Sequence, residues 1–203
     1  MAVRVDDRAY GAPGLAIAPM RRRHLRAVLR IEAQVYPRPW TLRLFMSELA
    51  LRNTRTYTVA QVDGIVVGYS GLMVTGEDAH VTTIAVDPAW HRRGVGARLL
   101  IEMARTAVEL GARHLTLEVR MSNEPAKRLY TKFGFAPAGV RKNYYVETNE
   151  DALVMWANDI DTADYRHRLT RIELGLPGIE APGGAVGPEG PVGHPGEAGG
   201  GRR

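Results

Sequence analysis

Residues 82–100 read TTIAVDPAWHRRGVGARLL, and this stretch predicts a strand, a basic loop with two glycines, and a helix. Pro88 ends the strand, because proline cannot donate a hydrogen bond to a strand ladder. The helix is amphipathic, since apolar residues recur along one side of it: Val95, Leu99, Met103 and Leu110. Its first turn exposes backbone N–H groups that have no partner within the helix, and such groups favour an anion.

The residues of the loop indicate that this anion is a diphosphate. Gly94 and Gly96 lack the Cβ atoms that would keep a ligand away from the backbone, while Arg92 and Arg93 add positive charge. A P-loop is excluded, because no Gly-Lys-Ser/Thr ending is present. A dinucleotide fingerprint is excluded as well, because Leu99 stands where its third glycine would be. The alternative is that the glycine pair only makes a tight turn into a helix.

The order Arg-Arg-Gly-Val-Gly-Ala after an Ile-Ala-Val-Asp-Pro strand resembles the acetyl-coenzyme A loop of the GNAT superfamily of N-acetyltransferases. The superfamily pattern is Gln/Arg-x-x-Gly-x-Gly/Ala, and His91 departs from it at the first position. The resemblance implies that acetyl-coenzyme A (acetyl-CoA) is the co-substrate. Together with the branch motifs described below, it implies a set of cofactor-binding residues: Ile84, Ala85, Val86, Arg92, Arg93, Gly94, Val95, Gly96, Ala97 and Asn123.

Composition excludes several other classes of protein. The chain has 203 residues, of which 45% are hydrophobic, and this suits one packed domain with an appendage. It has no cysteine, so disulfides, thiolate metal sites and a cysteine nucleophile are excluded. The first residues include Arg4, Asp6, Asp7 and Arg8 and no apolar stretch, so we expect no signal peptide. No apolar run approaches the ~20 residues that a membrane span needs. We therefore expect a cytoplasmic protein with no membrane partner.

Charge and histidine spacing say less about partners. The formal net charge of +5 favours anionic partners only weakly, and we expect no direct nucleic-acid role. The histidines show no metal-ligand spacing, so we expect no metal. His80 is expected to be structural or solvated, like the other histidines outside the loop.

Hydrophobic periodicity predicts one domain over residues 14–160. We expect strands at about 15–18, 56–62, 65–74, 79–86, 114–119, 139–146 and 152–157. We expect helices at about 21–34, 41–51, 95–110 and 123–132. Asp63-Gly64 predicts a hairpin turn, and Gly111 predicts the end of a helix. This order implies an α/β (α+β) fold with a mixed, mostly antiparallel sheet flanked by helices, which is also the GNAT acyl-CoA N-acyltransferase arrangement.

The two ends of the chain are predicted to differ from this domain. Residues 1–13 are expected to be flexible, and residues 161–176 to form a helical extension. Of the 25 residues from 177 to 201, ten are glycine and five are proline, so we expect a disordered tail over 177–203. Glycine at every third position from Gly184 to Gly199 is also typical of collagen, but the run is only six triplets long.

Motifs after the loop resemble one branch of the superfamily. Leu-Glu-Val-Arg-x-Ser-Asn at 117–123, followed by Ala-x-x-Leu-Tyr-x-x-Phe-Gly-Phe at 126–135, is similar to the RimI-type N-terminal acetyltransferases. Pro-Arg-Pro-Trp at 37–40 and Arg-Lys-Asn-Tyr-Tyr at 141–145 fit the same branch. The resemblance implies that the partner is a protein N-terminus, the N-terminal alanine of a small-subunit ribosomal protein. The sequence leaves the oligomeric state open.

The resemblance to this branch makes Glu118 the general base and Tyr130 the general acid of a direct transfer. Glu118 lies on the strand face opposite Leu115 and Leu117, as a residue aimed at a cleft would. An α-amine of pKa ~7.7–8.0 costs only about 1 kcal/mol to deprotonate at pH 7, against about 4.6 kcal/mol for a lysine. By pattern alone, Glu118 would be a solvent-facing strand residue and Tyr130 a core aromatic, while Asn123 would cap a helix.

Four aromatic residues are predicted to bind the peptide substrate by lining its channel: Tyr36, Trp40, Tyr144 and Tyr145. In this superfamily the strand with Ile84 and Val86 and the strand with Glu118 separate, and a backbone N–H near Val86 would polarise the thioester carbonyl. Two alternatives stay open. One is a GNAT enzyme for lysine side chains or small amines, and the other is a non-catalytic module that senses acyl-CoA or binds the ribosome.

Overall fold

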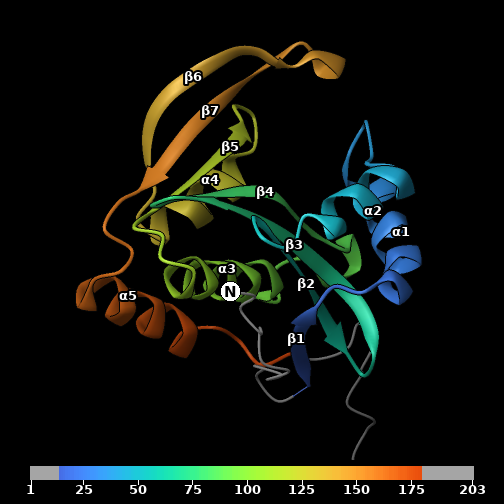
Figure 1. Cartoon of the computed structure of the whole chain (residues 1–203), viewed down its shortest axis with the longest axis horizontal. Helices are drawn as coiled ribbons and strands as arrows, with labels where there is room; N and C mark the ends of the chain where they lie inside the picture. The colour runs from blue at the N-terminus through green and yellow to red at the C-terminus, as the bar shows by residue number, and fades with distance from the viewer. Residues whose placement is uncertain (1–13, 180–203) are drawn as a thin grey trace, which may run out of the picture.

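The computed structural model describes residues 14–179 and contains one seven-stranded sheet, in the order β1-β2-β3-β4-β5-β7-β6 (Figure 1). The strands are β1 (Leu15–Pro19), β2 (Arg55–Val62), β3 (Ile65–Thr75), β4 (Asp78–Val86), β5 (His114–Arg120), β6 (Ala136–Tyr145) and β7 (Glu150–Ala157). Every neighbouring pair is antiparallel except β4 and β5. The predicted mixed, mostly antiparallel sheet is therefore confirmed. The predicted flexible N-terminus and most of the predicted tail lie outside the described residues.

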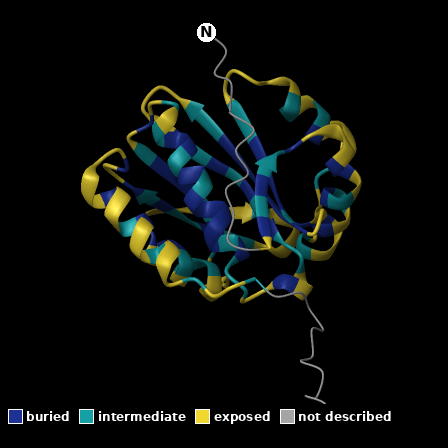
Figure 2. Cartoon of the chain, turned by 90° about the horizontal axis from the view of Figure 1, so that it is seen from below, coloured by how far each residue is buried: buried dark blue, intermediate teal, exposed yellow. Residues whose placement is uncertain are grey.

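The helices cover both faces of the sheet, and Figure 2 shows buried strands beneath helices whose outer sides are exposed. They are α1 (Leu25–Val35), α2 (Leu42–Ala50), α3 (Val95–Glu109), α4 (Glu124–Lys132) and α5 (Ala163–Leu174). Three short 3-10 turns complete the order: η1 (Arg22–His24), η2 (Pro88–Trp90) and η3 (Val146–Thr148). Thr41 caps α2 by accepting the Leu44 N–H at 3.2 Å, as its side chain predicts.

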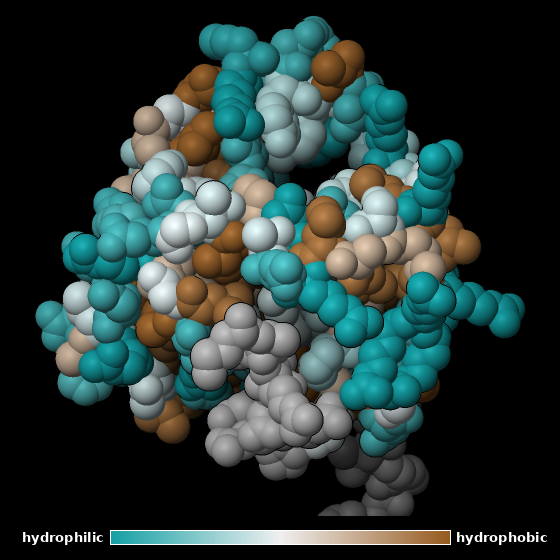
Figure 3. Space-filling view, viewed as in Figure 1, coloured by the Kyte–Doolittle hydropathy of each residue, from teal (hydrophilic) through white to brown (hydrophobic). Residues whose placement is uncertain are grey.

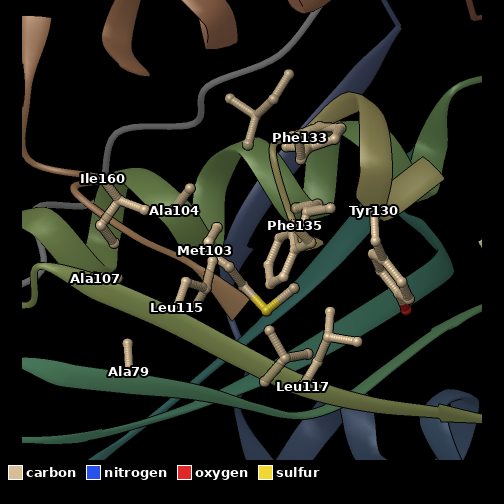
Figure 4. Close-up of a cluster of buried hydrophobic side chains, with 14 of the residues drawn as sticks. Ala79, Met103, Ala104, Ala107, Leu115, Leu117, Tyr130, Phe133, Phe135 and Ile160 are labelled. Atoms are coloured by element: carbon tan, nitrogen blue, oxygen red, sulfur yellow. The ribbon is translucent and has the colours of Figure 1, made fainter. Parts of the chain in front are cut away.

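The hydrophobic residues form clusters on the two faces of the sheet. On one face, α1 and α2 pack against β2 and β3 through Val28, Ile31, Phe45 and Tyr69. On the other face, α3, α4 and α5 pack against β5 and β7, and Figure 4 shows part of this cluster. Tyr165 and Leu169 of α5 belong to it, with 6% and 4% of their surface exposed. The helix that follows β7 therefore contributes to the main core.

The largest differences from the predicted element boundaries are at the start of the first helix and at the start of β6. The first helix begins as the 3-10 turn η1 and becomes α-helical only at Leu25. Strand β6 begins at Ala136, three residues before the predicted start at 139, and it includes Pro137. The proline is tolerated because β6 pairs only with β7, and an edge strand leaves one row of backbone groups without ladder bonds.

Strands β4 and β5 separate soon after they begin. They pair only where Asp78, Ala79 and His80 lie beside His114, Leu115 and Thr116. Between β3 and β4 the register shifts, because Gly71 lies opposite Thr83 and Leu72 opposite Val81, so Thr82 is an extra residue in β4. Such a bulge bends a strand away from its partner. Beyond His80, β4 runs on to Val86 and β5 to Arg120, so the sheet is split near its middle, as the superfamily resemblance implies.

Candidate active site

The split between β4 and β5 opens into a cavity of about 330 Å³. In Figure 3 the surface is hollowed between the β6–β7 hairpin and the helices α1 and α2. Eight of the predicted site residues line the cavity: Tyr36, Trp40, Ile84, Glu118, Asn123, Tyr130, Tyr144 and Tyr145. They come from the segment after α1, from β4 and β5, from α4 and its N-cap, and from β6. The fold therefore brings together the two predicted catalytic residues and all four predicted aromatic residues.

Glu118 is held between two cationic or potentially cationic side chains. Its Oε1 lies 3.0 Å from a guanidinium nitrogen of Arg141, and its Oε2 lies 3.2 Å from Nε2 of His80. Only 9% of the Glu118 side chain is exposed. Hydrogen bonding to His80 holds the pKa of Glu118 below its ordinary value, with the charge of Arg141 acting in the same direction and burial opposing both. The carboxylate therefore stays ionised at neutral pH.

His80 is a site residue that the sequence analysis missed. It was expected to be structural or solvated, but it lines the cavity and contacts Glu118. Its other ring nitrogen, Nδ1, lies 2.8 Å from the Thr116 hydroxyl, because β4 and β5 are still paired at this point. The signal in the sequence was alternation: His80 shares a strand face with Thr82 and Ile84, as Thr116 does with Glu118. Only the parallel pairing of the two strands shows that these faces meet.

Tyr130 lies where the main hydrophobic cluster meets the cavity. Figure 4 shows its ring at the edge of the cluster and its hydroxyl oxygen directed away from the other labelled residues. The side chain is 6% exposed and packs on Phe135 with 5.8 Å between the ring centroids. Burial raises the pKa of Tyr130 above that of an ordinary phenol, so the hydroxyl keeps its proton at neutral pH. Tyr130 therefore belongs to the main hydrophobic cluster and also lines the cavity.

The backbone of β4 directs alternate residues into the split. Asp87 donates its N–H to the Val67 carbonyl of β3 at 2.9 Å. Because hydrogen-bonding residues alternate along an antiparallel strand, the backbone N–H and C=O groups of Val86 and Ile84 point away from β3, toward the split. The Ile84 carbonyl accepts a hydrogen bond from the Tyr36 hydroxyl at 2.9 Å, and the Val86 carbonyl lies 3.0 Å from Nε2 of His91. Ala85, in contrast, is only 3% exposed and packs in the cluster beneath α1 and α2.

The loop after β4 presents the N-terminus of α3. Gly94 is the N-cap residue, with a left-handed backbone at φ +76°, and no side chain caps the helix there. The first N–H groups of α3, at Val95, Gly96 and Ala97, therefore need an acceptor from outside the helix. Arg93 stacks on Trp90, with its guanidinium carbon 5.8 Å from the ring centroid. These backbone N–H donors, the two arginines of the loop and the absence of a Cβ at Gly94 together fit a diphosphate.

Four aromatic residues form the aromatic wall of the cavity: Tyr36, Trp40, Tyr144 and Tyr145. The part of this wall that follows α1 is held in place by buried polar contacts. Glu32 in α1 is 1% exposed; its carboxylate accepts the Trp40 N–H at 2.9 Å and the Tyr69 hydroxyl. Burial raises the pKa of Glu32, against the lowering effect of these two hydrogen bonds. The sequence analysis did not single out Glu32, although a carboxylate on the apolar side of α1, four residues after Val28, is a signal of a buried polar contact.

The other part of the aromatic wall, Tyr144 and Tyr145, comes from the end of β6. Arg120 lies over the Tyr145 ring, with its guanidinium carbon 3.9 Å from the centroid, and pairs with Glu147 at 2.7 Å and Glu150 at 3.4 Å. Burial raises the pKa of Tyr145 to about 12, with Arg120 acting against it. Arg120 therefore holds the hairpin over the cavity.

Asn123 lies at the start of α4. It caps the helix by accepting the Ala126 N–H at 3.1 Å, as its residue type predicts, and it also lines the cavity.

Comparison with known proteins identifies the class of enzyme, an acetyltransferase. The model of the acetyltransferase (GNAT) family matches residues 25–135, more than half of the chain. The chain belongs to the GNAT family of acetyltransferases. The non-catalytic alternative is thereby set aside. In the described part of the chain, no helix has the length and apolar character needed to cross a bilayer.

Within the family, the chain is similar to proteins that are named as N-terminal acetyltransferases. The chain is 41% identical over 141 residues to a putative [ribosomal protein bS18]-alanine N-acetyltransferase of Bacillus subtilis, covering 70% of this chain and 93% of the relative. It is 35% identical over 150 residues to the N-alpha-acetyltransferase RimI of Mycobacterium tuberculosis, covering 70% and 90% of the two chains. The crystal structure of the ribosomal-protein-S18-alanine N-acetyltransferase from Escherichia coli superposes with a TM-score of 0.66 at 31% identity, over 71% of this chain and 94% of that one.

Proposed function

We propose that this enzyme acetylates the α-amino group of a protein N-terminus, with the N-terminal alanine of ribosomal protein bS18 as its substrate. The observation that carries the proposal is the cavity in the split sheet, where Glu118 and Tyr130 face one space beneath an aromatic wall. The names of the relatives from Bacillus subtilis and Escherichia coli support the choice of substrate. A channel walled by Tyr36, Trp40, Tyr144 and Tyr145 suits an extended peptide better than a small free amine.

GNAT acetyltransferases use acetyl-CoA, which supplies an acetyl group activated as a thioester. In this chain the N-terminus of α3, from Gly94 to Ala97, would bind the diphosphate, with Arg92 and Arg93 beside it. The backbone groups of Ile84 and Val86 would pair with the amide groups of the pantetheine arm. The carbonyl of Ile84 already accepts a hydrogen bond from Tyr36, so this pairing would use the remaining acceptor capacity of β4.

Three groups of this chain would perform the transfer. The ionised Glu118 accepts a proton from the incoming α-amine, whose deprotonation costs only about 1 kcal/mol at pH 7. The N–H of Val86 donates to the carbonyl oxygen as negative charge develops there. The Tyr130 hydroxyl, kept protonated by burial, donates to the departing sulfur. The amine nitrogen forms the new bond to the acetyl carbon while the bond from that carbon to sulfur breaks.

The test is a substrate panel with the purified full chain. Acetyl-CoA would be offered with peptides that begin Ala-Arg, Ser or Met, and separately with free lysine and polyamines, while thiol release is followed. We expect the Ala-Arg peptide to give the highest kcat/KM and the product to carry the acetyl group on its α-nitrogen by mass spectrometry. Preference for lysine or a polyamine would instead support the small-amine alternative.

A further inference from the structure

A chain of three polar side chains connects β4 and β5 behind the predicted base. The Thr116 hydroxyl lies 2.8 Å from Nδ1 of His80, and Nε2 of His80 lies 3.2 Å from Oε2 of Glu118. The imidazole bridges the two strands at the last residue where they pair, immediately before they separate. It is partly buried, with 27% of its side chain exposed, and it lines the cavity together with Glu118.

The contacts of His80 fix where its hydrogens lie. Nε2 faces an ionised carboxylate, so it carries a hydrogen and donates it to Glu118. In the neutral ring, Nδ1 accepts a hydrogen bond from the Thr116 hydroxyl, and in the charged ring it donates to the same oxygen. The arrangement therefore accepts either charge state without moving. Histidine is the side chain type that changes charge between pH 5 and pH 8.

We propose that His80 is a positioning residue that acts through Glu118 and sets the pH range in which that carboxylate accepts protons. The inference rests on the proposed role of Glu118 as the base. When His80 is neutral, one hydrogen bond aims Oε2 and leaves the carboxylate its basicity. When His80 is charged, Glu118 lies between two cations, His80 and Arg141, and its capacity to take a proton from the amine falls.

Other charged groups face the same space and belong to the electrostatic balance of His80. Arg141 of β6 contacts the other oxygen of Glu118 at 3.0 Å. The remaining ionisable groups around the cavity come from α1 and the segment after it, β5, α4, the end of β6 and η3: Glu32, Arg38, Arg120, Glu147 and the tyrosines described above. Arg120 pairs with Glu147 and Glu150. Glu118 is the carboxylate that contacts the imidazole of His80.

The first experiment compares the pH dependence of kcat for His80→Gln, His80→Ala and the wild type with the same Ala-Arg peptide. Glutamine keeps an N–H donor toward Glu118 but does not titrate in this range. Titration of the peptide amine contributes equally to every profile, so differences between profiles isolate His80. A single ionisation changes a rate by at most about tenfold per pH unit, so removing the imidazole flattens the profile. We expect the kcat profile of His80→Gln to be flatter than that of the wild type between pH 5.5 and pH 8, and His80→Ala to lower kcat at every pH.

His114→Gln is the matched control, since His114 is a partly buried histidine of β5 outside the cavity. Its profile should follow the wild type. If the His80→Gln profile also superposes on the wild type, the proposal is wrong, and His80 only fills space.

The second experiment needs no activity. The ring signals of His80 are identified in NMR spectra by their absence from His80→Gln, and their pH dependence is compared in the wild type and in Glu118→Gln. Because the carboxylate contacts Nε2 at 3.2 Å, its removal should change the pH dependence of the His80 signals and leave that of the His114 signals as in the wild type. An unchanged pH dependence of the His80 signals would contradict the coupling. If the wild type acetylated no amine at all, the proposed function would fail, yet this comparison would still decide whether His80 and Glu118 act together.

Discussion

At the scale of single residues, the site depends on how Glu118 is surrounded. Its two oxygens are engaged by Arg141 and His80, and this environment lowers its pKa. Glu118→Gln removes the charge but keeps the size, so we expect kcat to fall by about 10²-fold or more with little change in the Kd of acetyl-CoA. Steady-state kinetics and calorimetry measure the two quantities. Glu102→Gln in α3, outside the cavity, is the control, and unchanged turnover in Glu118→Gln would remove Glu118 from the mechanism.

The same environment predicts a pH dependence of stability. Because the folded pKa of Glu118 lies below its ordinary value, the contribution of its contacts to stability is present above the ordinary carboxyl range. It is lost as the pH falls through the lowered pKa. The difference in free energy of unfolding between wild type and Glu118→Gln should therefore shrink below about pH 4. Denaturant titrations at several pH values test this, and a difference that grows on acidification would contradict it.

Tyr130 gives a second prediction at this scale. Tyr130→Phe removes only the hydroxyl, so the ring packing on Phe135 should persist while kcat falls by about 10²-fold. Tyr165→Phe is a closely matched control, because the Tyr165 hydroxyl is also buried, has no hydrogen-bond partner among the described residues, and lies in α5. Wild-type turnover in Tyr130→Phe would leave Tyr130 as a core aromatic only.

Residue types and spacing gave the members of the site but not its contacts. Glu118, Tyr130 and the aromatic wall could be named because their motifs resemble a known branch, and the fold places them around one cavity. Their roles stay predictions. His80 and Glu32 could not be assigned from spacing, because each acts through a partner distant in the sequence. His80 meets residues 36 and 38 positions later, and Glu32 meets Tyr69 37 positions later.

At the scale of elements, the loop between β4 and α3 depends on the backbone of Gly94. Its φ of +76° is strained for any L-residue, and a Cβ there would lie 2.6 Å from Arg98 Nη1. We expect Gly94→Ala to raise the KM for acetyl-CoA by about tenfold or more, because the helix N-terminus would shift. Gly64→Ala is the control: it has a φ of +78° in the open β2–β3 turn, with nothing within 4 Å. Equal effects of the two variants on KM would refute a role for the loop.

Element types were predictable because local signals agree with tertiary packing. Thr41, Asp63-Gly64 and Gly111 mark boundaries through capping and left-handed backbone, and the structure has φ values of +49°, +78° and +89° at Asp63, Gly64 and Gly111. The start of β6 was missed because Pro137 is a breaker in most strands and is tolerated only at an edge. Which strand lies at the edge is decided by the pairing of β6 with β7, which no local pattern encodes.

At the scale of the whole molecule, α5 joins the main core although it lies beyond residues 25–135, which the family model matches. Leu169 is 4% exposed, and Arg105 of α3 forms a two-point ion pair with Glu173 at 2.6 and 3.2 Å. Leu169→Ala should lower the free energy of unfolding by about 2–5 kcal/mol without changing the catalytic residues. Leu174→Ala in the same helix, where the side chain is 82% exposed, is the control. Equal midpoints of thermal unfolding for the two variants would contradict this.

The predicted division of the chain at residue 160 stays a prediction. Ile160 is fully buried, and the helix after it packs into the same cluster, so the extension and the preceding domain share hydrophobic contacts. Residues 177–179 of the predicted tail also touch the domain: the Pro177 carbonyl accepts a hydrogen bond from Arg98 at 2.7 Å, and Ile179 packs beside the cluster of Leu15 and Trp90. Glycine and proline content predicts the chain's flexibility but not these contacts.

The short pairing of β4 with β5 has a consequence for isotope exchange. Ile84 and Val86 lie in a central strand, yet their amides point into the split, where no β5 residue pairs with them. Their hydrogens should exchange for deuterium quickly in the free enzyme, unlike those of the β3-facing residues beside them. If an acyl carrier bonds to these amides as proposed, adding it should slow the exchange at alternate positions of β4 only.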